Sequence, residues 1–208
     1  MLESNDAHAT AWSQACAEFA IELPASFFRP LIGMGGDKIL AKLGGDLSEQ
    51  TEPGKSIARR RKEIFLERYV ARLKPTPGAR ALVERLRADQ LSPVVASSAK
   101  NEELKALLEA AQIADLIDEA ATSDDADRSK PDPDIVESAL AKGRVFNSEA
   151  LMIGDTPYDI EAAAKAGVRI IAVRCGGWSD RELAGAAAVY DDPQDLLRRY
   201  DDSPLAKR

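Results

Sequence analysis

Cysteine and histidine are scarce in this sequence of 208 residues, which contains two cysteines and a single histidine. Cys16 and Cys175 lie far apart and have no Cys-x-x-Cys spacing. The sequence therefore encodes neither a disulfide framework nor a cysteine-based zinc site. Such cysteine usage is typical of proteins that work in a reducing cytoplasm.

Long apolar runs and excess positive charge are also absent. No apolar run approaches the ~20 residues that a membrane-spanning helix requires. The formal net charge of -7 disfavours general binding to nucleic acid or to an anionic membrane. The one basic run, residues 59–62, falls in a helical pattern of mixed charge and is predicted to be a solvated helix face. We therefore expect a soluble, cytoplasmic protein without nucleic-acid or membrane partners.

What the sequence does contain is an ordinary globular composition, 45% hydrophobic and 30% charged. Residues 1–73 show helical spacing of apolar residues and no strand signal, so they predict a helical domain. After the Pro- and Gly-containing segment 75–78, strand and helix patterns alternate over residues 74–208. This alternation predicts a second domain of the α/β class, with a doubly wound and mainly parallel sheet.

The individual elements are expected at the following positions. In the first domain, helices are predicted near residues 5–19, after 24, after 37 and over 50–73. In the second, strands are predicted at 91–97, 119–122, 151–154, 169–173 and 187–190. Helices are expected at 77–89, 101–111, 133–143, 157–166 and 194–199, with Thr76 capping the first of these and Asp132 the third.

The stretch from 151 to 159 organises the second domain. It begins as an apolar strand, and Gly154 then allows a tight turn that places Asp155 just past the strand's carboxyl end, where ligands bind in such sheets. Thr156 and Pro157 start a helix, so Asp155 and Asp159 can face the same crevice. Carboxylates there suit Mg²⁺, a hard cation that prefers oxygen ligands. The alternative is that they serve only the helix cap and dipole.

Two further features belong to the same edge of the predicted sheet. Ser97 and Ser98 directly follow a strand and precede a helix, so their hydroxyl and N–H groups can cradle a phosphate, although such residues often serve only as caps. Lys130 lies between Ser129 and Pro131, and the prolines of this loop would hold its charge beside a phosphate or a carboxylate. A single lysine is more often merely solvated.

In this order, strand–Ser, Lys-Pro and strand–Gly-Asp-x-x-x-Asp, the motifs resemble the haloacid dehalogenase-like hydrolases. The likeness is to the phosphoglycolate phosphatase and β-phosphoglucomutase branch, and it covers essentially the whole chain. It implies a Rossmann-like core with an inserted helical cap. It also implies that Ser97 binds the transferring phosphate, that Lys130 neutralises phosphate and nucleophile, and that Asp155 ligates Mg²⁺, supported by Asp159.

The same resemblance assigns expected roles in the cap. The opening segment, residues 3–12, looks like the first cap helix of this branch, and His8 matches a position that faces substrate in some relatives. The glycine-rich turn from Gly33 to Lys38 is the expected specificity element. Mutase relatives carry an arginine just after this turn, where this sequence has Gly36, Asp37 and Lys38, which favours a simple phosphatase over a sugar-phosphate mutase.

The family's first motif, a central strand ending in Asp-x-Asp, is missing from these residues. Its first aspartate attacks phosphorus, so the 208 residues alone are expected to be inactive. Residues 132–134 follow Lys-Pro and no apolar strand, and residues 124–127 lie in a polar loop, so neither segment is a credible replacement. We expect the gene product to begin upstream of Met1; direct pairing of the two flanking strands is the less favoured alternative.

Three classes of function remain open on the sequence. The favoured one is a Mg²⁺-dependent phosphohydrolase that acts on a small phosphorylated metabolite by way of an aspartyl-phosphate. The second is a non-catalytic protein that retains Ser97, Lys130 and Asp155 to bind phosphate or a metabolite. A phosphoacceptor signalling domain ranks last, because it has no need of a helical cap. The substrate stays open, and the protein is expected to be a monomer or a homodimer.

Overall fold

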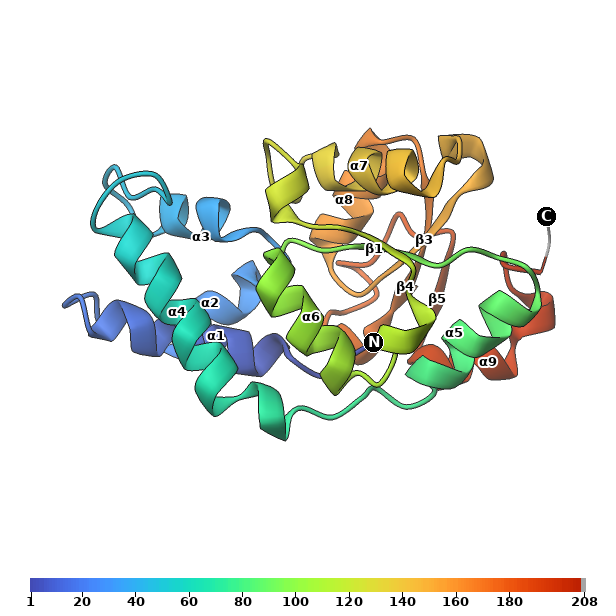
Figure 1. The fold of residues 1–208 in the computed structure, drawn as a ribbon, viewed down its shortest axis with the longest axis horizontal. Helices are drawn as coiled ribbons and strands as arrows, with labels where there is room; N and C mark the ends of the chain where they lie inside the picture. Colours follow the sequence, from blue (N-terminus) through green and yellow to red (C-terminus); the bar gives the residue numbers. More distant parts are fainter. Residues whose placement is uncertain (207–208) are drawn as a thin grey trace.

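The helical spacing of the first residues produces a lobe of helices in the computed structural model, which describes residues 1–206 (Figure 1). These helices share an apolar core that includes Trp12, Phe28 and Phe65, each at most 2% exposed. The elements are α1 (Asn5–Ala17), α2 (Ala25–Phe28), α3 (Gly36–Lys42) and α4 (Gly54–Arg68), with 3₁₀ turns at Arg29–Leu31 and Val70–Arg72. The helix α4 is shorter than the expected 50–73, because Pro53 precedes it and the 3₁₀ turn follows it.

The second lobe alternates strands and helices, as predicted, and its described strand pairs are all parallel. Its strands are β1 (Val94–Ala96), β2 (Glu119–Ala121), β3 (Leu151–Gly154), β4 (Arg169–Val173) and β5 (Ala188–Tyr190). Its helices are α5 (Ala79–Ala88), α6 (Asn101–Ala110), α7 (Asp134–Gly143), α8 (Pro157–Lys165) and α9 (Pro193–Arg198). The predicted α/β fold class is confirmed.

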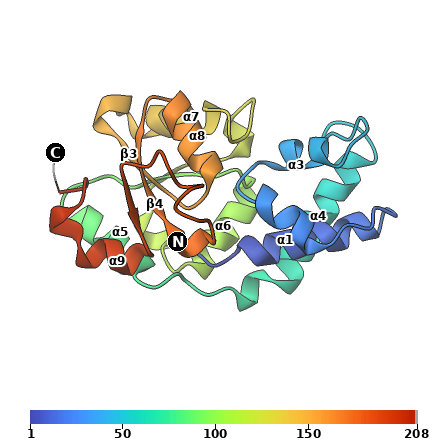
Figure 2. The ribbon, with the colours of Figure 1, turned by 180° about the vertical axis from the view of Figure 1, so that it is seen from behind.

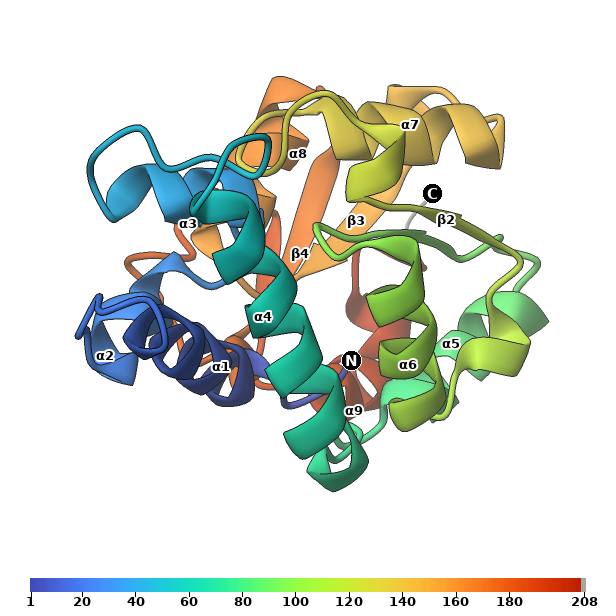
Figure 3. The same cartoon turned by 60° about the vertical axis from the view of Figure 1, so that its left-hand side comes forward.

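Helices cover both faces of the strands, which makes the lobe doubly wound (Figures 2 and 3). Successive side chains of β4 point to opposite faces of the sheet, as the pleat of a strand requires. Ile171 and Val173 lie in one core cluster with residues of α5 and α9. Ile170 and Ala172 lie in another with residues of α7 and α8. This two-sided burial explains why β4 reads in the sequence as a continuous apolar run.

The sheet is divided between β1 and β3. Among the described residues β1 pairs with β2, and β3 pairs with β4, which also pairs with β5. Four of the five β4 residues are buried, whereas every residue of β1 and β3 is only half-buried. In the described structure β1 and β3 therefore do not pair with each other, and residues of both strands line a cavity.

Two expected helix starts are wrong. Thr76 is buried, and α5 begins at Ala79, after Gly78. Gly78 has φ 75°, and a Cβ there would lie 2.5 Å from Cα of Gln194, so the close approach of α9 selects glycine at this position. Pro133 rather than Asp132 occupies the N-cap of α7. The Asp132 carboxylate pairs instead with a lysine of the helical lobe, a contact that local sequence does not reveal.

Two chain segments join the lobes, and they run side by side. Leu2 forms an antiparallel bridge with Pro75, and the Glu3 N–H donates to the Lys74 carbonyl at 3.1 Å. The domain boundary predicted between residues 73 and 74 falls in the second segment and stays a prediction. In the described residues, no helix is long and apolar enough to cross a membrane. The cytoplasmic location and the monomeric or homodimeric state also stay predictions.

Candidate active site

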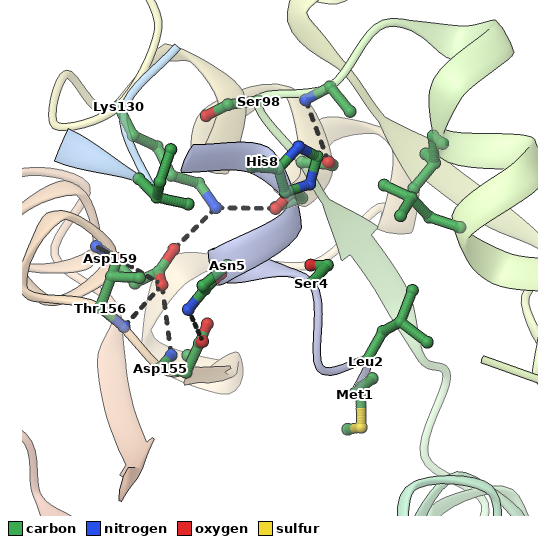
Figure 4. Close-up of a pocket in the computed structure, with 18 of the residues that line it drawn as sticks. Met1, Leu2, Ser4, Asn5, His8, Ser98, Lys130, Asp155, Thr156 and Asp159 are labelled. Atoms are coloured by element: carbon green, nitrogen blue, oxygen red, sulfur yellow. Dashed lines mark hydrogen bonds and ion pairs between the residues drawn. The ribbon is translucent and has the colours of Figure 1, made fainter. Parts of the chain in front are cut away.

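The side chains predicted to act together line one cavity between the two lobes (Figure 4). The cavity has a volume of about 310 Å³ and lies where β1 and β3 end. The predicted site residues that line it are His8, Gly33, Ser97, Ser98, Lys130, Asp155 and Asp159. Lys38 is not among the lining residues. The parallel strands explain this convergence, since their carboxyl ends meet at one edge.

Lys130 is the cation at the centre of the site, and it is only 6% exposed. Its Nζ lies 2.8 Å from Oδ1 of Asp159 and donates at 2.8 Å to the carbonyl of Ala96 at the end of β1. The lysine thus bridges the two parts of the divided sheet. Burial acts to raise the pKa of Asp159, but Lys130 and the hydrogen bonds around the carboxylate hold that pKa below its usual range.

Both carboxylate oxygens of Asp159 accept hydrogen bonds from other groups of the protein. Oδ1 faces Lys130, while Oδ2 accepts from the N–H groups of Asp155 and Thr156 and from the Thr156 hydroxyl at 2.8 Å. The Thr156 hydroxyl accepts in turn from the Asp159 N–H, which completes a capping box at the start of α8. A Cβ on Gly154 would lie 2.6 Å from that of Asp159, so glycine is needed for this approach. Asp159 therefore holds Lys130 and the strand end in place.

Asp155 is the carboxylate that remains available to a ligand. Its Oδ2 accepts from Asn5 Nδ2 at 3.2 Å, and its side chain lines the cavity (Figure 4). Burial, followed by repulsion from Asp159, raises its pKa. A buried carboxylate whose charge is disfavoured in this way is stabilised by an added cation.

The serine pair leaves one polar atom without a partner. Ser97 Oγ accepts from the Ala99 N–H at 3.1 Å, which is a local turn contact. Ser98 Oγ is buried, has no hydrogen-bond partner among the described residues, and belongs to a residue that lines the cavity. Because an unsatisfied buried hydroxyl costs about 1–3 kcal/mol, a ligand that accepts its hydrogen bond is favoured here.

His8 lies on the cap side of the cavity. Its ring stacks on Phe65 with centroids 3.9 Å apart, and Nδ1 lies 3.7 Å from Oε1 of Glu103. Burial lowers the pKa of His8 to about 4, opposed by Glu103 and assisted by Arg61. The imidazole is therefore neutral at pH 7.

This pKa is directly measurable, because His8 is the single histidine of the sequence. Its NMR titration should have a midpoint near pH 4, below the unperturbed 6.5. Between these values the unfolded chain binds more protons, so the free energy of unfolding should fall as the pH drops, by up to about 3 kcal/mol. His8→Gln should remove this part of the pH dependence. A midpoint above about pH 6 would contradict the burial of the ring.

The sequence interpretation of the basic run is wrong for one residue. Arg61 is only 15% exposed at its side chain, lies over the ring of Trp12, and pairs with Glu103 at 2.7 Å. Arg61 lines the cavity, and its Nε is buried without a hydrogen-bond partner in residues 1–206. The signal that could have revealed it is helical spacing, since Arg61 lies four residues after Ile57 and four before Phe65, both fully buried.

Three other residues at the site were missed by sequence reasoning. Asn5 donates to Asp155 and also to the Gly176 carbonyl at 3.1 Å. Glu103 is 2% exposed, and its carboxylate forms an ion pair with Arg61. Trp12 lines the cavity from α1. Each becomes a site residue only through the contact between the lobes, which no local pattern encodes.

Fold and site together define a class: α/β proteins in which a helical cap lies over the carboxyl ends of parallel strands, with a buried lysine and a carboxylate in the cavity between them. Within this class, the chain belongs to the haloacid dehalogenase-like hydrolase family, whose model matches residues 1–173. The resemblance drawn from the sequence motifs is thereby confirmed.

Individual relatives agree with this assignment. The chain is 36% identical over 118 residues to a phosphoglycolate phosphatase of Rhodospirillum rubrum, covering 56% of this chain and 48% of the relative. It is 33% identical over 117 residues to a putative pyrophosphatase of Caldanaerobacter subterraneus, covering 56% and 50%. The chain thus matches about half the length of these curated relatives. A solved hydrolase from Pseudomonas syringae superposes with a TM-score of 0.88 at 28% identity, covering 97% of this chain and 93% of that one.

Proposed function

We propose that this chain forms the cap and most of the catalytic core of a phosphohydrolase that acts on a small phosphorylated metabolite. The observation that carries the proposal is the cavity in which a buried lysine, an available carboxylate and an unpartnered serine hydroxyl meet. A phosphate ester would supply anionic oxygens to the lysine and an acceptor to the hydroxyl. The names of the two curated relatives, a phosphoglycolate phosphatase and a putative pyrophosphatase, agree with such a substrate class.

The residues present divide the work of binding a phosphate. Lys130 neutralises the phosphate and the nucleophile, while Ser97 and Ser98 donate to the phosphate oxygens. Asp159 orients Lys130 through the 2.8 Å ion pair. The cap lobe, with His8 and Gly33 in the cavity lining, excludes water and contacts the rest of the substrate.

Asp155 is the residue that would hold Mg²⁺. Its disfavoured buried charge fits a cation, and Mg²⁺ accepts one or two protein carboxylates while keeping water and phosphate oxygens as its other ligands. The described residues contain no group of three or more His, Cys, Asp or Glu side chains placed to hold a metal. When bound, the ion would supply positive charge opposite the phosphate.

The attacking carboxylate of such a hydrolysis stays unassigned among the described residues that line the cavity. Hydrolysis through an aspartyl-phosphate needs a carboxylate in line with the phosphorus. Within the described residues, the acids that line the cavity are Glu103, Asp155 and Asp159, and Glu103 and Asp159 are engaged with cations. The unpaired edges of β1 and β3 border the same cavity, so a strand lying between them would end beside Lys130 and Asp155.

The test is to fuse an apolar strand ending in Asp-x-Asp to the N-terminus and to assay p-nitrophenyl phosphate. The fusion should hydrolyse the ester only with Mg²⁺, and the same fusion with Asn at the first Asp should be inactive. The 208-residue chain should also be inactive. A folded fusion that binds Mg²⁺ but hydrolyses no phosphomonoester would overturn the proposal.

The second candidate is a non-catalytic phosphate-binding or metabolite-binding protein. The described residues include Ser97, Lys130 and Asp155 but no identified nucleophile, which favours this candidate. It predicts saturable phosphate binding by the 208-residue chain and no gain of hydrolysis in the fusion. The same assay therefore separates the two functions.

A further inference from the structure

The glycine turn of the cap rests on the core loop that carries Lys130. At the start of α3, the Asp37 carboxylate accepts a hydrogen bond from the Ser129 hydroxyl. One residue further, Lys38 Nζ lies 2.7 Å from Oδ2 of Asp132. These four side chains, two from the cap and two from the core, are called the clasp below.

The absence of a side chain at Gly35 allows this contact. A Cβ there would lie 2.2 Å from the Ser129 Cβ and 2.3 Å from its Oγ. The backbone itself does not demand glycine, because φ at Gly35 is -73°, which any residue adopts. Glycine at this position is therefore explained by the cap lying against the core, and not by the shape of the turn.

The clasp holds the backbone on both sides of Lys130. Ser129 immediately precedes the lysine, is 7% exposed, and is bound by Asp37. Asp132 follows two residues later, and its N–H donates to the Ser129 carbonyl at 3.0 Å. A displacement of this short loop moves the Cα of Lys130, whose Nζ must stay within 2.8 Å of both Asp159 and Ala96.

The ion pair between Lys38 and Asp132 in the clasp can break and form again. Lys38 and Asp132 are 35% and 19% exposed at their side chains, so water can reach the pair. On the core side, Asp132 also faces Lys165 Nζ at 3.6 Å, and the nearby Arg128 pairs with Asp134. An ion pair that water can reach in this way is weak and is screened by salt. It can form when the cap lies on the core and break when the cap leaves.

We propose that the clasp couples the position of the cap to the position of Lys130, so that Asp37 and Lys38 act as positioning residues. The phosphate-binding part of this inference rests on the proposed function, in which Lys130 neutralises the phosphate. When the cap covers the cavity, the contacts of the clasp form and hold the loop that carries Lys130 in place. Lys38 thereby receives a role other than substrate contact, in keeping with its position outside the cavity lining.

Gly35→Ala in the 208-residue chain tests the clasp without altering charge. Hydrogen–deuterium exchange over residues 128–133 should become at least about fivefold faster, because the new methyl forces the turn away from Ser129. Gly36→Ala is the matched control for exchange, since its Cβ would clash with the flexible end of Glu49, at 2.3 Å, and make an ordinary contact with Trp12, at 3.5 Å. Ser129→Gly in the Gly35→Ala background removes the Ser129 Cβ and Oγ that the methyl would meet and leaves only the flexible end of Asp37, at 2.6 Å. The pair of Lys38 and Asp132 can then form again, so part of the slow exchange should return.

Lys38→Met supplies a second variant that keeps the turn intact. It should speed exchange in the same loop and weaken binding of inorganic phosphate in the presence of Mg²⁺, each by about two- to fivefold. Lys38→Arg should restore both, and Lys42→Met, an exposed lysine on the same helix, should change neither. Equal exchange of residues 128–133 in the wild type, Gly35→Ala and Lys38→Met would overturn the clasp. If wild-type protein bound no phosphate, the proposed function would fail, while the exchange data would still decide whether the clasp exists.

Discussion

Replacing Lys130 with methionine is expected to lower the free energy of unfolding at pH 7 by about 3–5 kcal/mol, the usual cost of leaving one member of a buried ion pair alone. The side chains of Lys130 and its partner Asp159 are 7% and 9% exposed, so water cannot replace the lysine as the partner of the carboxylate. The Ala96 carbonyl would also lose its bond from Nζ, and with it the bridge between the two parts of the sheet. Urea unfolding monitored by circular dichroism measures the loss.

The pH dependence of this loss has a defined sign. In the wild type the pKa of Asp159 is lowered in the folded state, so its contribution is present above the unfolded pKa and is lost as the pH falls through the folded value. Without Lys130, burial dominates and the folded pKa rises above the unfolded one. The destabilisation of Lys130→Met should therefore shrink as the pH is lowered through that raised value.

Two controls separate the buried pair from general effects of losing a lysine. Lys130→Met combined with Asp159→Asn should regain much of the lost stability, because no buried charge is left unpaired. Lys165→Met removes an exposed lysine that pairs with Glu161 and also contacts Pro131 and Asp132, and it should cost at most about 1 kcal/mol. If Lys130→Met cost no more than Lys165→Met at pH 7, the ion pair would not have the role described.

Replacing Asp155 with asparagine should separate ligand binding from stability. Mg²⁺ affinity should fall at least about 100-fold, since the ionised carboxylate that would hold the cation is gone. The free energy of unfolding of the metal-free protein should rise, because burial and Asp159 both disfavour the Asp155 charge. The amide oxygen can still accept from Asn5, so the local contact is kept.

Calorimetric titration with Mg²⁺ and urea unfolding measure these two effects on the same variant. Asp127→Asn, at an exposed position, is the control and should change neither quantity. Unchanged Mg²⁺ affinity, or a clear loss of stability in Asp155→Asn, would mean that Asp155 serves the fold rather than a cation.

The sequence predicts those features that depend on local pattern. The strand at 169–173 was placed at its observed bounds, because β4 is apolar toward both faces and is followed by a turn. The meeting of Ser97, Lys130 and Asp155 followed from the common direction of parallel strands. Service to the helix cap is one of the two roles that the sequence allows for Asp159, and the structure shows it as a capping box with Thr156.

Features made by the contact of the two lobes were not predictable in this way. Arg61 was assigned to solvent because its neighbours are charged, although its spacing from Ile57 and Phe65 places it on the buried face. The sequence places Gly35 in a glycine-rich turn, but the reason for glycine there is a side chain 94 residues away in the sequence, Ser129. Such contacts require knowledge of how the cap lies on the core.

The most direct test of the central claim, that these strand ends form one phosphate site, is an NMR titration of the 208-residue chain with inorganic phosphate in the presence of Mg²⁺. The amide signals of Ser98, Lys130 and Asp155 should shift together and follow one dissociation constant. Signals that fail to saturate, or saturating shifts confined to other parts of the protein, would contradict it.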